Sequence, residues 1–210
     1  MVYHRLYTIV LCFIMVLFIG ITTPNHADTS TGCDFESLKA IIAHLNREGG
    51  GEIMLDCTTI IRFTEKLIIQ SDITINGNDT LVLNGYGLYT LFDVQGSLTL
   101  NKVIIERGWR AIHNNGKLTL NESILRQNQA YSAGGALWNN GIVYINSSTF
   151  IDNQTDIGGA IFNYGGGYLV IHNSTFTMNS AYTGGGAIKN LGYLSIKNST
   201  FTDNMVEYGG

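Results

Sequence analysis

The second half of this 210-residue chain repeats one pattern at a nearly constant period. Gly-Gly-Ala occurs at 134–136, 158–160 and 185–187, each time followed by Leu or Ile. A Phe-x-x-Asn segment runs in step with it, starting at Phe150 and recurring after 26 and then 25 residues. A period of this length is typical of a solenoid, in which one short supersecondary unit is stacked many times.

Each repeat contains short apolar runs that alternate with polar positions, and this pattern predicts strands. One strand position accepts lysine and should therefore face water; in successive repeats it holds His113, Trp138, Phe162 and Lys189. Because one coil cannot cover its own apolar face, stacking must bury it between neighbours. The sequence therefore predicts an all-β fold, a right-handed parallel β-helix with coils of about 25 residues.

Matching positions in successive repeats predict ladders of like side chains inside the solenoid. Stacked asparagine amides can hydrogen-bond to one another, and asparagine tolerates the left-handed backbone that a corner needs. We therefore expect the asparagine columns to take the left-handed corner positions. The predicted ladders consist of Asn128, Asn153, Asn179 and Asn204, of Asn114, Asn139, Asn163 and Asn190, and of Phe150, Phe176 and Phe201.

One helix is predicted beyond residue 27, over Asp34–Glu48. Apolar residues recur there at helical spacing, Asp34 can cap the first turn, and three glycines at 49–51 end the pattern. Such a helix would cover the strand edges of the first coil. We expect an N-terminal cap over residues 28–57 and a β-helix over residues 58–210. Because the chain stops where the next Gly-Gly-Ala strand is due, we expect this β-helix to be truncated at its carboxyl end.

Residues 1–27 are predicted to be a signal peptide. An apolar run over Thr8–Ile21 follows a weakly basic start, Pro24 breaks the run, and the expected cut follows Ala27. An uncleaved anchor is the alternative, although the run is shorter than the roughly 20 residues of a spanning helix. We expect the mature chain to have no membrane span. The predicted location is secreted or cell-surface, with the outer membrane included.

Two cysteines, Cys33 and Cys57, remain after removal of the signal. An even pair in an exported chain predicts a disulfide, and two separate buried thiols are the alternative. Two cysteines alone make a poor zinc site, and we expect neither a metal nor a cofactor. The net charge of −4 leaves no basic surface for nucleic acid, so that class of partner is excluded.

The alternation of Gly-Gly-Ala-Ile/Leu with Phe-x-x-Asn resembles the repeats of polymorphic outer-membrane proteins and of other exported bacterial β-helix proteins with a pectin-lyase-like fold. The order Cys33, short helix, glycine turn and Cys57 is similar to the start of such proteins. The resemblance covers residues 33–210. It implies a right-handed parallel β-helix, export and an adhesin-like role, but a stacked repeat does not define what its outer surface binds.

Pectin-cleaving lyases and hydrolases share this fold, so a polysaccharide lyase or glycoside hydrolase is the alternative function. Hydrolysis needs two suitably spaced carboxylates, and Asp152 and Asp203 hold equivalent positions two repeats apart. Acids at corners are more often turn formers, and no acid cluster with a base is present for lyase chemistry. One column of the repeat holds serines, Ser123, Ser148, Ser174 and Ser199, and it lacks a histidine and an acid at constant spacing. His113 is expected to be a solvated residue without a partner. We predict no catalytic residues.

Outward-facing aromatic residues supply the candidate ligand surface. Trp138 and Phe162 are neighbours in one column, and Tyr144 faces outward on the adjacent strand. Exposed rings of this kind often mark sites that stack on sugars or anchor proteins. The sequence therefore predicts a non-catalytic, adhesin-like scaffold that binds a glycan or a protein on a host or neighbouring cell. A purely structural spacer is a further alternative.

One coil departs from the period, because the step from Ile105 to Leu125 is only 20 residues. Its loop carries Trp109 between Arg107 and Arg110. An irregular loop on a regular scaffold is the best place for a specific site, and a plain connecting loop is the alternative.

Overall fold

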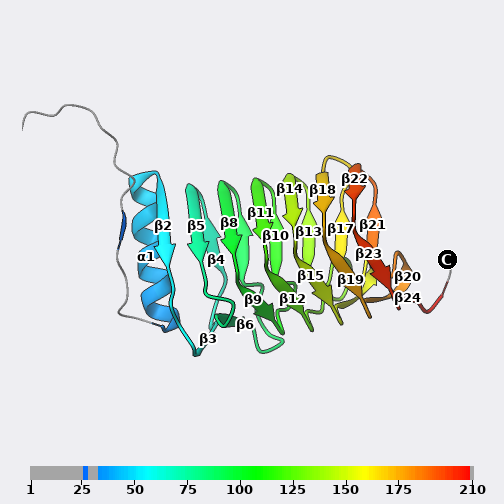
Figure 1. Ribbon diagram of the computed structural model, residues 1–210, viewed down its shortest axis with the longest axis horizontal. Coiled ribbons are helices and arrows are strands. Elements are labelled where there is room, and N and C mark those ends of the chain that lie inside the picture. Colours follow the sequence, from blue (N-terminus) through cyan, green and yellow to red (C-terminus); the bar gives the residue numbers. More distant parts are fainter. Residues whose placement is uncertain (1–25, 28–32, 209–210) are drawn as a thin grey trace, which may run out of the picture.

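The computed structural model of this protein is a parallel β-helix of about six turns with one helix across its amino end (Figure 1). It describes residues 26–27 and 33–208. Apart from His26 and Ala27, the predicted signal peptide lies outside the described residues. Within the described residues, no helix has the length and apolar character needed to span a membrane.

Three long parallel sheets run along the solenoid axis, and each coil contributes one short strand to each sheet in turn. Sheet A contains β1 (His26–Ala27), β2 (Gly50–Met54), β5 (Asp72–Asn76), β8 (Ser97–Asn101), β11 (Lys117–Asn121), β14 (Ile142–Asn146), β18 (Tyr168–His172) and β22 (Tyr193–Lys197). Sheet B contains β3 (Ile60–Arg62), β6 (Val82–Asn84), β9 (Ile104–Glu106), β12 (Ile124–Arg126), β15 (Thr149–Ile151), β19 (Thr175–Thr177) and β23 (Thr200–Thr202). Sheet C contains β4 (Leu67–Ile69), β7 (Phe92–Val94), β10 (Ile112–Asn114), β13 (Leu137–Asn139), β17 (Ile161–Asn163) and β21 (Ile188–Asn190).

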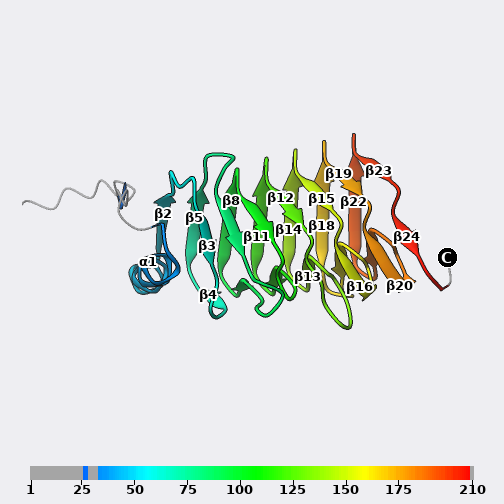
Figure 2. The ribbon, with the colours of Figure 1, turned by 90° about the horizontal axis from the view of Figure 1, so that it is seen from below.

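A fourth sheet, sheet D, adds a strand to the last three coils. It contains β16 (Gln154–Ile157), β20 (Ser180–Gly184) and β24 (Met205–Val206), which lie side by side near the carboxyl end (Figure 2). Isolated bridges continue the alignment to Gln129 and Trp109. The shorter coil has too few residues for such a strand, since only Trp109 and Arg110 separate Gly108 from Ala111.

Strand pairing places equivalent residues of successive coils next to one another. Phe150 pairs with Phe176, and Phe176 with Phe201, with ring centroids 4.7 and 4.8 Å apart and ring planes within 7° of parallel. These distances match the separation of adjacent strands, about 4.8 Å. Phe150 and Phe176 are fully buried, whereas Phe201, in the last coil, is 41% exposed.

Two ladders of hydrogen-bonded asparagine side chains link successive coils at the corners. Asn128, Asn153, Asn179 and Asn204 are linked in that order by Nδ2 donating to Oδ1 over 3.0, 2.9 and 2.9 Å. A second ladder joins Asn114, Asn139, Asn163 and Asn190 over 2.8, 2.7 and 2.6 Å. In the first ladder, the Asn153 amide also donates to the Leu125 carbonyl at 2.9 Å and accepts from the Asn128 backbone N–H at 3.1 Å. A buried polar group needs such partners, and this amide has them.

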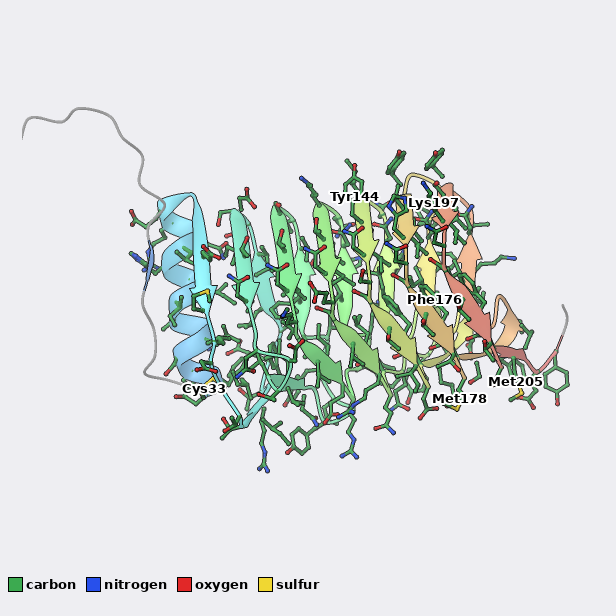
Figure 3. All side chains as sticks on the ribbon, viewed as in Figure 1. Cys33, Tyr144, Phe176, Met178, Lys197 and Met205 are labelled. Carbon is green, nitrogen blue, oxygen red and sulfur yellow. A yellow bond between two sulfur atoms is a disulfide. The ribbon has the colours of Figure 1, made fainter. Side chains whose placement is uncertain are left out.

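The left-handed corner position is not the asparagine of the first ladder, so that expectation was wrong. It is the residue before each asparagine: φ lies between 53° and 55° at Gln127, Asp152, Met178 and Asp203. The asparagine side chain must point inward to bond the adjacent coils, so the exposed preceding residue takes the turn. Met178 accordingly points away from the solenoid (Figure 3). Asp152 and Asp203 are therefore exposed corner residues.

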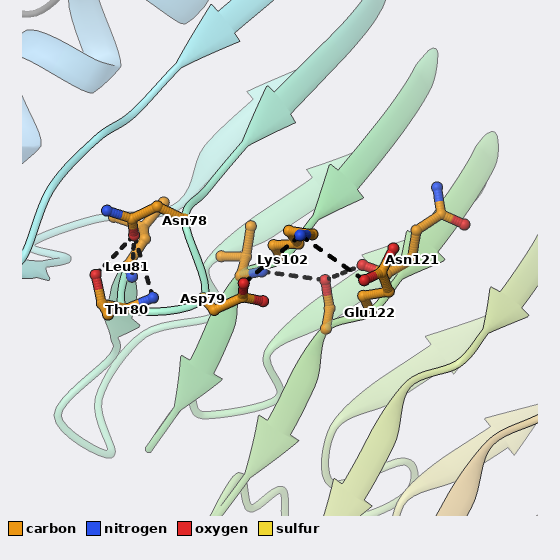
Figure 4. A network of polar contacts seen from close by, with 9 residues as sticks. Asn78, Asp79, Thr80, Leu81, Lys102, Asn121 and Glu122 are labelled. Atoms are coloured by element: carbon orange, nitrogen blue, oxygen red, sulfur yellow. Dashed lines mark hydrogen bonds and ion pairs between the residues drawn. The ribbon is translucent and has the colours of Figure 1, made fainter.

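The corner after sheet A also uses left-handed residues other than glycine. Asp79, Lys102 and Glu122 have φ values of 66°, 55° and 49°. The Lys102 Nζ lies 3.6 Å from the Asp79 carboxylate and 3.9 Å from that of Glu122, so the three side chains form a line across successive coils (Figure 4). Exposed ion pairs of this kind contribute at most about 1 kcal/mol each.

The two glycines of the Gly-Gly-Ala motif are required for different reasons. Gly158 has a φ of 68°, a backbone conformation that favours glycine. A Cβ on Gly159 would lie 2.0 Å from the Gly186 carbonyl oxygen in the next coil, so close stacking excludes any side chain there.

The helix α1 (Phe35–Glu48) lies across the first coils and closes the amino end of the core (Figure 1). Asp34 is its N-cap and accepts a hydrogen bond from the Ser37 backbone N–H at 2.9 Å. The buried face of the helix consists of Phe35, Leu38, Ile42 and Leu45. A disulfide joins Cys33, just before the helix, to Cys57 after β2, with their Cα atoms 5.7 Å apart.

Candidate functional site

The predicted aromatic surface divides between two sheets. Trp138 on β13 and Phe162 on β17 are in register, with ring centroids 6.2 Å apart. Tyr144 lies on β14 of sheet A, where its ring is 6.4 Å from that of Tyr168 (Tyr144 is labelled in Figure 3). The structure therefore brings Trp138 and Phe162 together and places Tyr144 in a separate group.

The Trp138 ring is packed, not open. The guanidinium of Arg110 lies over its face at 4.6 Å and donates to the Ala133 carbonyl at 3.1 Å. The His113 ring is 5.1 Å away on the adjacent strand. The indole Nε1 is buried and has no hydrogen-bond partner among the described residues. Half-buried rings with these neighbours leave little flat surface for a ligand.

His113 has a carboxylate neighbour, so the expectation of a solvated, partnerless residue was wrong. Its Nδ1 lies 3.6 Å from an Oδ1 of Asp93, which occupies the same outward position one coil earlier. The other Asp93 oxygen accepts from the Lys66 amine at 2.8 Å. Burial lowers the pKa of His113; Asp93 opposes this change, while the positive charge of Arg110 adds to it.

Sheet A carries an exposed tyrosine pair that the sequence analysis did not identify. Tyr168 and Tyr193 begin β18 and β22, and their rings stack at 4.4 Å. Both side chains are more than a third exposed. The sequence contains a signal for this pair, because both tyrosines directly follow the equivalent turn glycines Gly167 and Gly192 of successive repeats.

A groove with a volume of about 660 Å³ follows sheet D. Its rings are Trp109, Tyr131 and Tyr182, and its carboxylates are Asp156 and Glu207. The remaining lining residues are Gln129, Ala130, Gln154, Thr155, Ser180, Ala181, Met205 and Val206. We call this feature the sheet D groove.

The bottom of the sheet D groove is made of small side chains. Ala130, Thr155 and Ala181 line it although each is more than nine-tenths buried. The Thr155 Oγ1 has no hydrogen-bond partner among the described residues. This oxygen is itself buried, because Thr155 points inward between the exposed Gln154 and Asp156, so it is not open to a ligand in the groove.

The groove runs along the solenoid axis, across the strands. Its lining residues Trp109, Gln129, Gln154, Ser180 and Met205 are in register on five successive coils. Four steps of strand separation make this row about 19 Å long. Met205 marks its carboxyl-terminal end in Figure 3. The shape therefore suits an extended ligand.

The irregular loop singled out in the sequence contributes one residue to this groove. Trp109 lines it and meets Tyr131 edge to face, with ring centroids 4.1 Å apart. Arg110 is not a lining residue and instead covers Trp138 on sheet C. Sequence reasoning missed Tyr131, Asp156, Tyr182 and Glu207, because the position they share, three residues after each ladder asparagine, holds no constant residue type.

The serine column has no free nucleophile in its buried part. The Ser148 Oγ accepts from the Ser123 backbone N–H at 3.1 Å and donates to the Asn146 carbonyl at 2.8 Å, and Ser174 repeats this arrangement. The described residues contain no group of three or more His, Cys, Asp or Glu side chains placed to hold a metal ion.

Comparisons with known proteins do not assign this site. Searches against protein-family models, curated proteins and solved structures found no match to this chain.

Proposed function

We propose that this protein is a non-catalytic β-helix scaffold, exported to the cell surface or secreted, that binds a carbohydrate chain in the sheet D groove. The observation that carries the proposal is the set of three rings, Trp109, Tyr131 and Tyr182, along one extended groove. Sugar rings stack on aromatic faces, and their hydroxyls bond to amide and hydroxyl groups. Gln129, Gln154 and Ser180 provide such groups.

The direction of the groove favours a carbohydrate over a peptide. Extended peptides bind β-proteins mainly by adding a strand to a free sheet edge. The sheet D groove instead crosses the strands, whose backbone groups are paired with neighbouring coils everywhere except at the outer edge of β24. Along the length of the groove the ligand meets side chains, and this suits a chain of rings and hydroxyls.

Export and an adhesin-like role rest on sequence. The apolar amino-terminal segment supports export. The Cys33–Cys57 disulfide is in keeping with an oxidising compartment. The resemblance of the Gly-Gly-Ala and Phe-x-x-Asn repeats to those of polymorphic outer-membrane proteins supports a surface role in adhesion.

A glycan-binding assay on the purified chain tests the proposal. Tyr131→Ala and Tyr182→Ala should each weaken binding at least about tenfold, because a stacking ring in a groove is a typical hot spot. Tyr164→Ala is the matched control, since Tyr164 is as exposed as Tyr182, at 49%, and lies outside the groove. Loss of binding only in Tyr164→Ala or Trp138→Ala would move the site to the sheet C aromatics. Absence of any carbohydrate ligand would favour the structural spacer.

A glycoside hydrolase is the second candidate, because Asp156 and Glu207 line the same groove. They sit two coils apart, so their backbones are separated by about 10 Å. Inverting hydrolases hold their carboxyl groups roughly 6.5–9.5 Å apart, a spacing that these side chains can reach. Release of reducing ends from a bound glycan, abolished by Asp156→Asn with binding retained, would establish this activity over pure binding. Release of unsaturated ends would instead indicate a lyase.

A further inference from the structure

The sheet D groove carries negative charge and no positive charge. Its lining includes Asp156 and Glu207 but no lysine, arginine or histidine. We infer that its ligand is a sugar chain bearing protonated amines, a polymer of amino sugars with free amino groups. This inference rests on the proposed function and names the class of carbohydrate that the groove selects.

The two groove carboxylates lack the basic neighbours that other acids of this protein have. Within the described residues neither Asp156 nor Glu207 forms an ion pair, and both are exposed. By contrast, Glu106 accepts from Arg126 at 2.6 Å, and Asp93 accepts from Lys66 at 2.8 Å. Two carboxylates without internal partners attract a cation from outside.

The aromatic residues of the groove strengthen the same preference. Trp109, Tyr131 and Tyr182 present rings whose negative faces attract an ammonium group. Such rings next to carboxylates bind a protonated amine by cation–π contact and by a charge-assisted hydrogen bond at once. A uronic acid chain would place its own carboxylates against Asp156 and Glu207, and like charges in a groove repel.

The spacing of the carboxylates requires a polymer to engage both of them. Asp156 and Glu207 are on coils two steps apart, about 10 Å along the groove. A single amino sugar can meet only one of them at a time. A chain with an amine on each ring can meet both while its rings contact the aromatic residues, so affinity should rise with chain length.

The experiment compares three oligosaccharides of equal length: a glucosamine oligomer, its N-acetylated form and a galacturonate oligomer. Calorimetry at about pH 5.5, where carboxylates are ionised, should show the glucosamine oligomer binding at least about tenfold more tightly than the neutral form. Galacturonate should not bind. The double variant Asp156→Asn, Glu207→Gln should lose this preference while keeping its affinity for the N-acetylated oligomer.

Controls separate the inference from the proposed function. The double variant Asp152→Asn, Asp203→Asn removes two exposed acids outside the groove and should leave binding unchanged. Equal or tighter binding of the neutral or acidic oligomer, still abolished by Tyr131→Ala, would overturn the inference and leave carbohydrate binding intact. A third outcome is that the glucosamine oligomer binds equally well to the wild type, to Tyr131→Ala and to the groove acid variant. That result would mean non-specific adsorption to an acidic protein and would also overturn the inference. No binding of any oligomer would count against the proposed function as well.

Discussion

Among single side chains, the buried asparagines have the most demanding role. Asn128, Asn153 and Asn179 have no exposed surface, yet each amide bonds to the coils on both sides. A buried amide in such a ladder stabilises the fold only while every member keeps its partners. The ladder therefore ties the position of each coil to that of its neighbours.

Replacing the central member tests this role. Asn153→Ala removes the partners of the Asn128 amide and of the Leu125 carbonyl, leaving buried polar groups unsatisfied. We expect the free energy of unfolding to fall by at least about 3 kcal/mol. Urea denaturation followed by circular dichroism measures it. Asn140→Ala, at an exposed corner, is the control and should change stability by less than about 0.5 kcal/mol.

His113 should make stability depend on pH. Burial lowers its pKa in the folded protein, while the unfolded value is about 6.5. Above about pH 6.5 His113 is neutral in both the folded and the unfolded protein, so it does not make the free energy of unfolding depend on pH. As the pH falls from about 6.5 toward the folded pKa, the unfolded state binds the extra proton and stability decreases. His113→Gln should show a shallower loss between pH 7 and the folded pKa; an identical slope would contradict the assignment.

Among secondary-structure elements, the helix and the fourth sheet modify an otherwise uniform stack. Helix α1 covers the amino end with its apolar face, and the disulfide holds its first turn next to the chain leaving β2. Strand β1 pairs with the outer edge of β2. Sheet D adds a strand in the last three coils, and residues of these strands line the groove.

Removing the disulfide should destabilise the cap without changing the sheets. The bond closes a loop with a sequence separation of 24, which corresponds to about 3 kcal/mol in the chain-entropy model. The double variant Cys33→Ser, Cys57→Ser should lower unfolding free energy by this order and keep the β-type circular dichroism spectrum. Asp34→Ala removes only the helix N-cap, so a loss of about 1 kcal/mol is expected. A larger loss from Asp34→Ala than from the cysteine variant would contradict this ranking.

In the molecule as a whole, a side chain is buried by the coils on its two sides. Phe176 and Phe201 occupy the same column, yet their exposed fractions are 0% and 41%. The difference arises because Phe176 has a stacked ring on each side, whereas Phe201 stacks only on Phe176 among the described residues. Stability in such a stack is close to a sum of interfaces between neighbours.

The position of a coil should therefore set the effect of an identical substitution. Phe176→Ala removes a fully buried ring, and a loss of about 4 kcal/mol is expected. Phe201→Ala should lose less than half of that, since part of its surface already contacts water. Equilibrium unfolding of both variants checks the ratio. Equal losses would show that stacking does not determine their contributions.

The fold could be predicted because its information is periodic. Phe150, Phe176 and Phe201 recur at coil length, and a stack with that register superposes them. The corner geometry could not be predicted from the sequence, because Asn153 and Asp152 both tolerate a left-handed backbone. Only the inward hydrogen bonds of Asn153 decide which of the two adopts it. The Asp93 neighbour of His113 was missed for a similar reason, since the register of β7 and β10 brings the two together.

The sheet D groove shows where periodic information ends. Tyr131, Asp156, Tyr182 and Glu207 recur at the coil period, each three residues after a ladder asparagine, but the residue type changes from coil to coil, so no repeated side chain marks this position. The order of residues along this chain specified a stacked β-structure, since each coil has to bury its apolar face against the next. Which side chains meet on the outside depends on how coils of unequal length align in three dimensions, so the groove and its unpaired carboxylates became visible only once the coils were superposed.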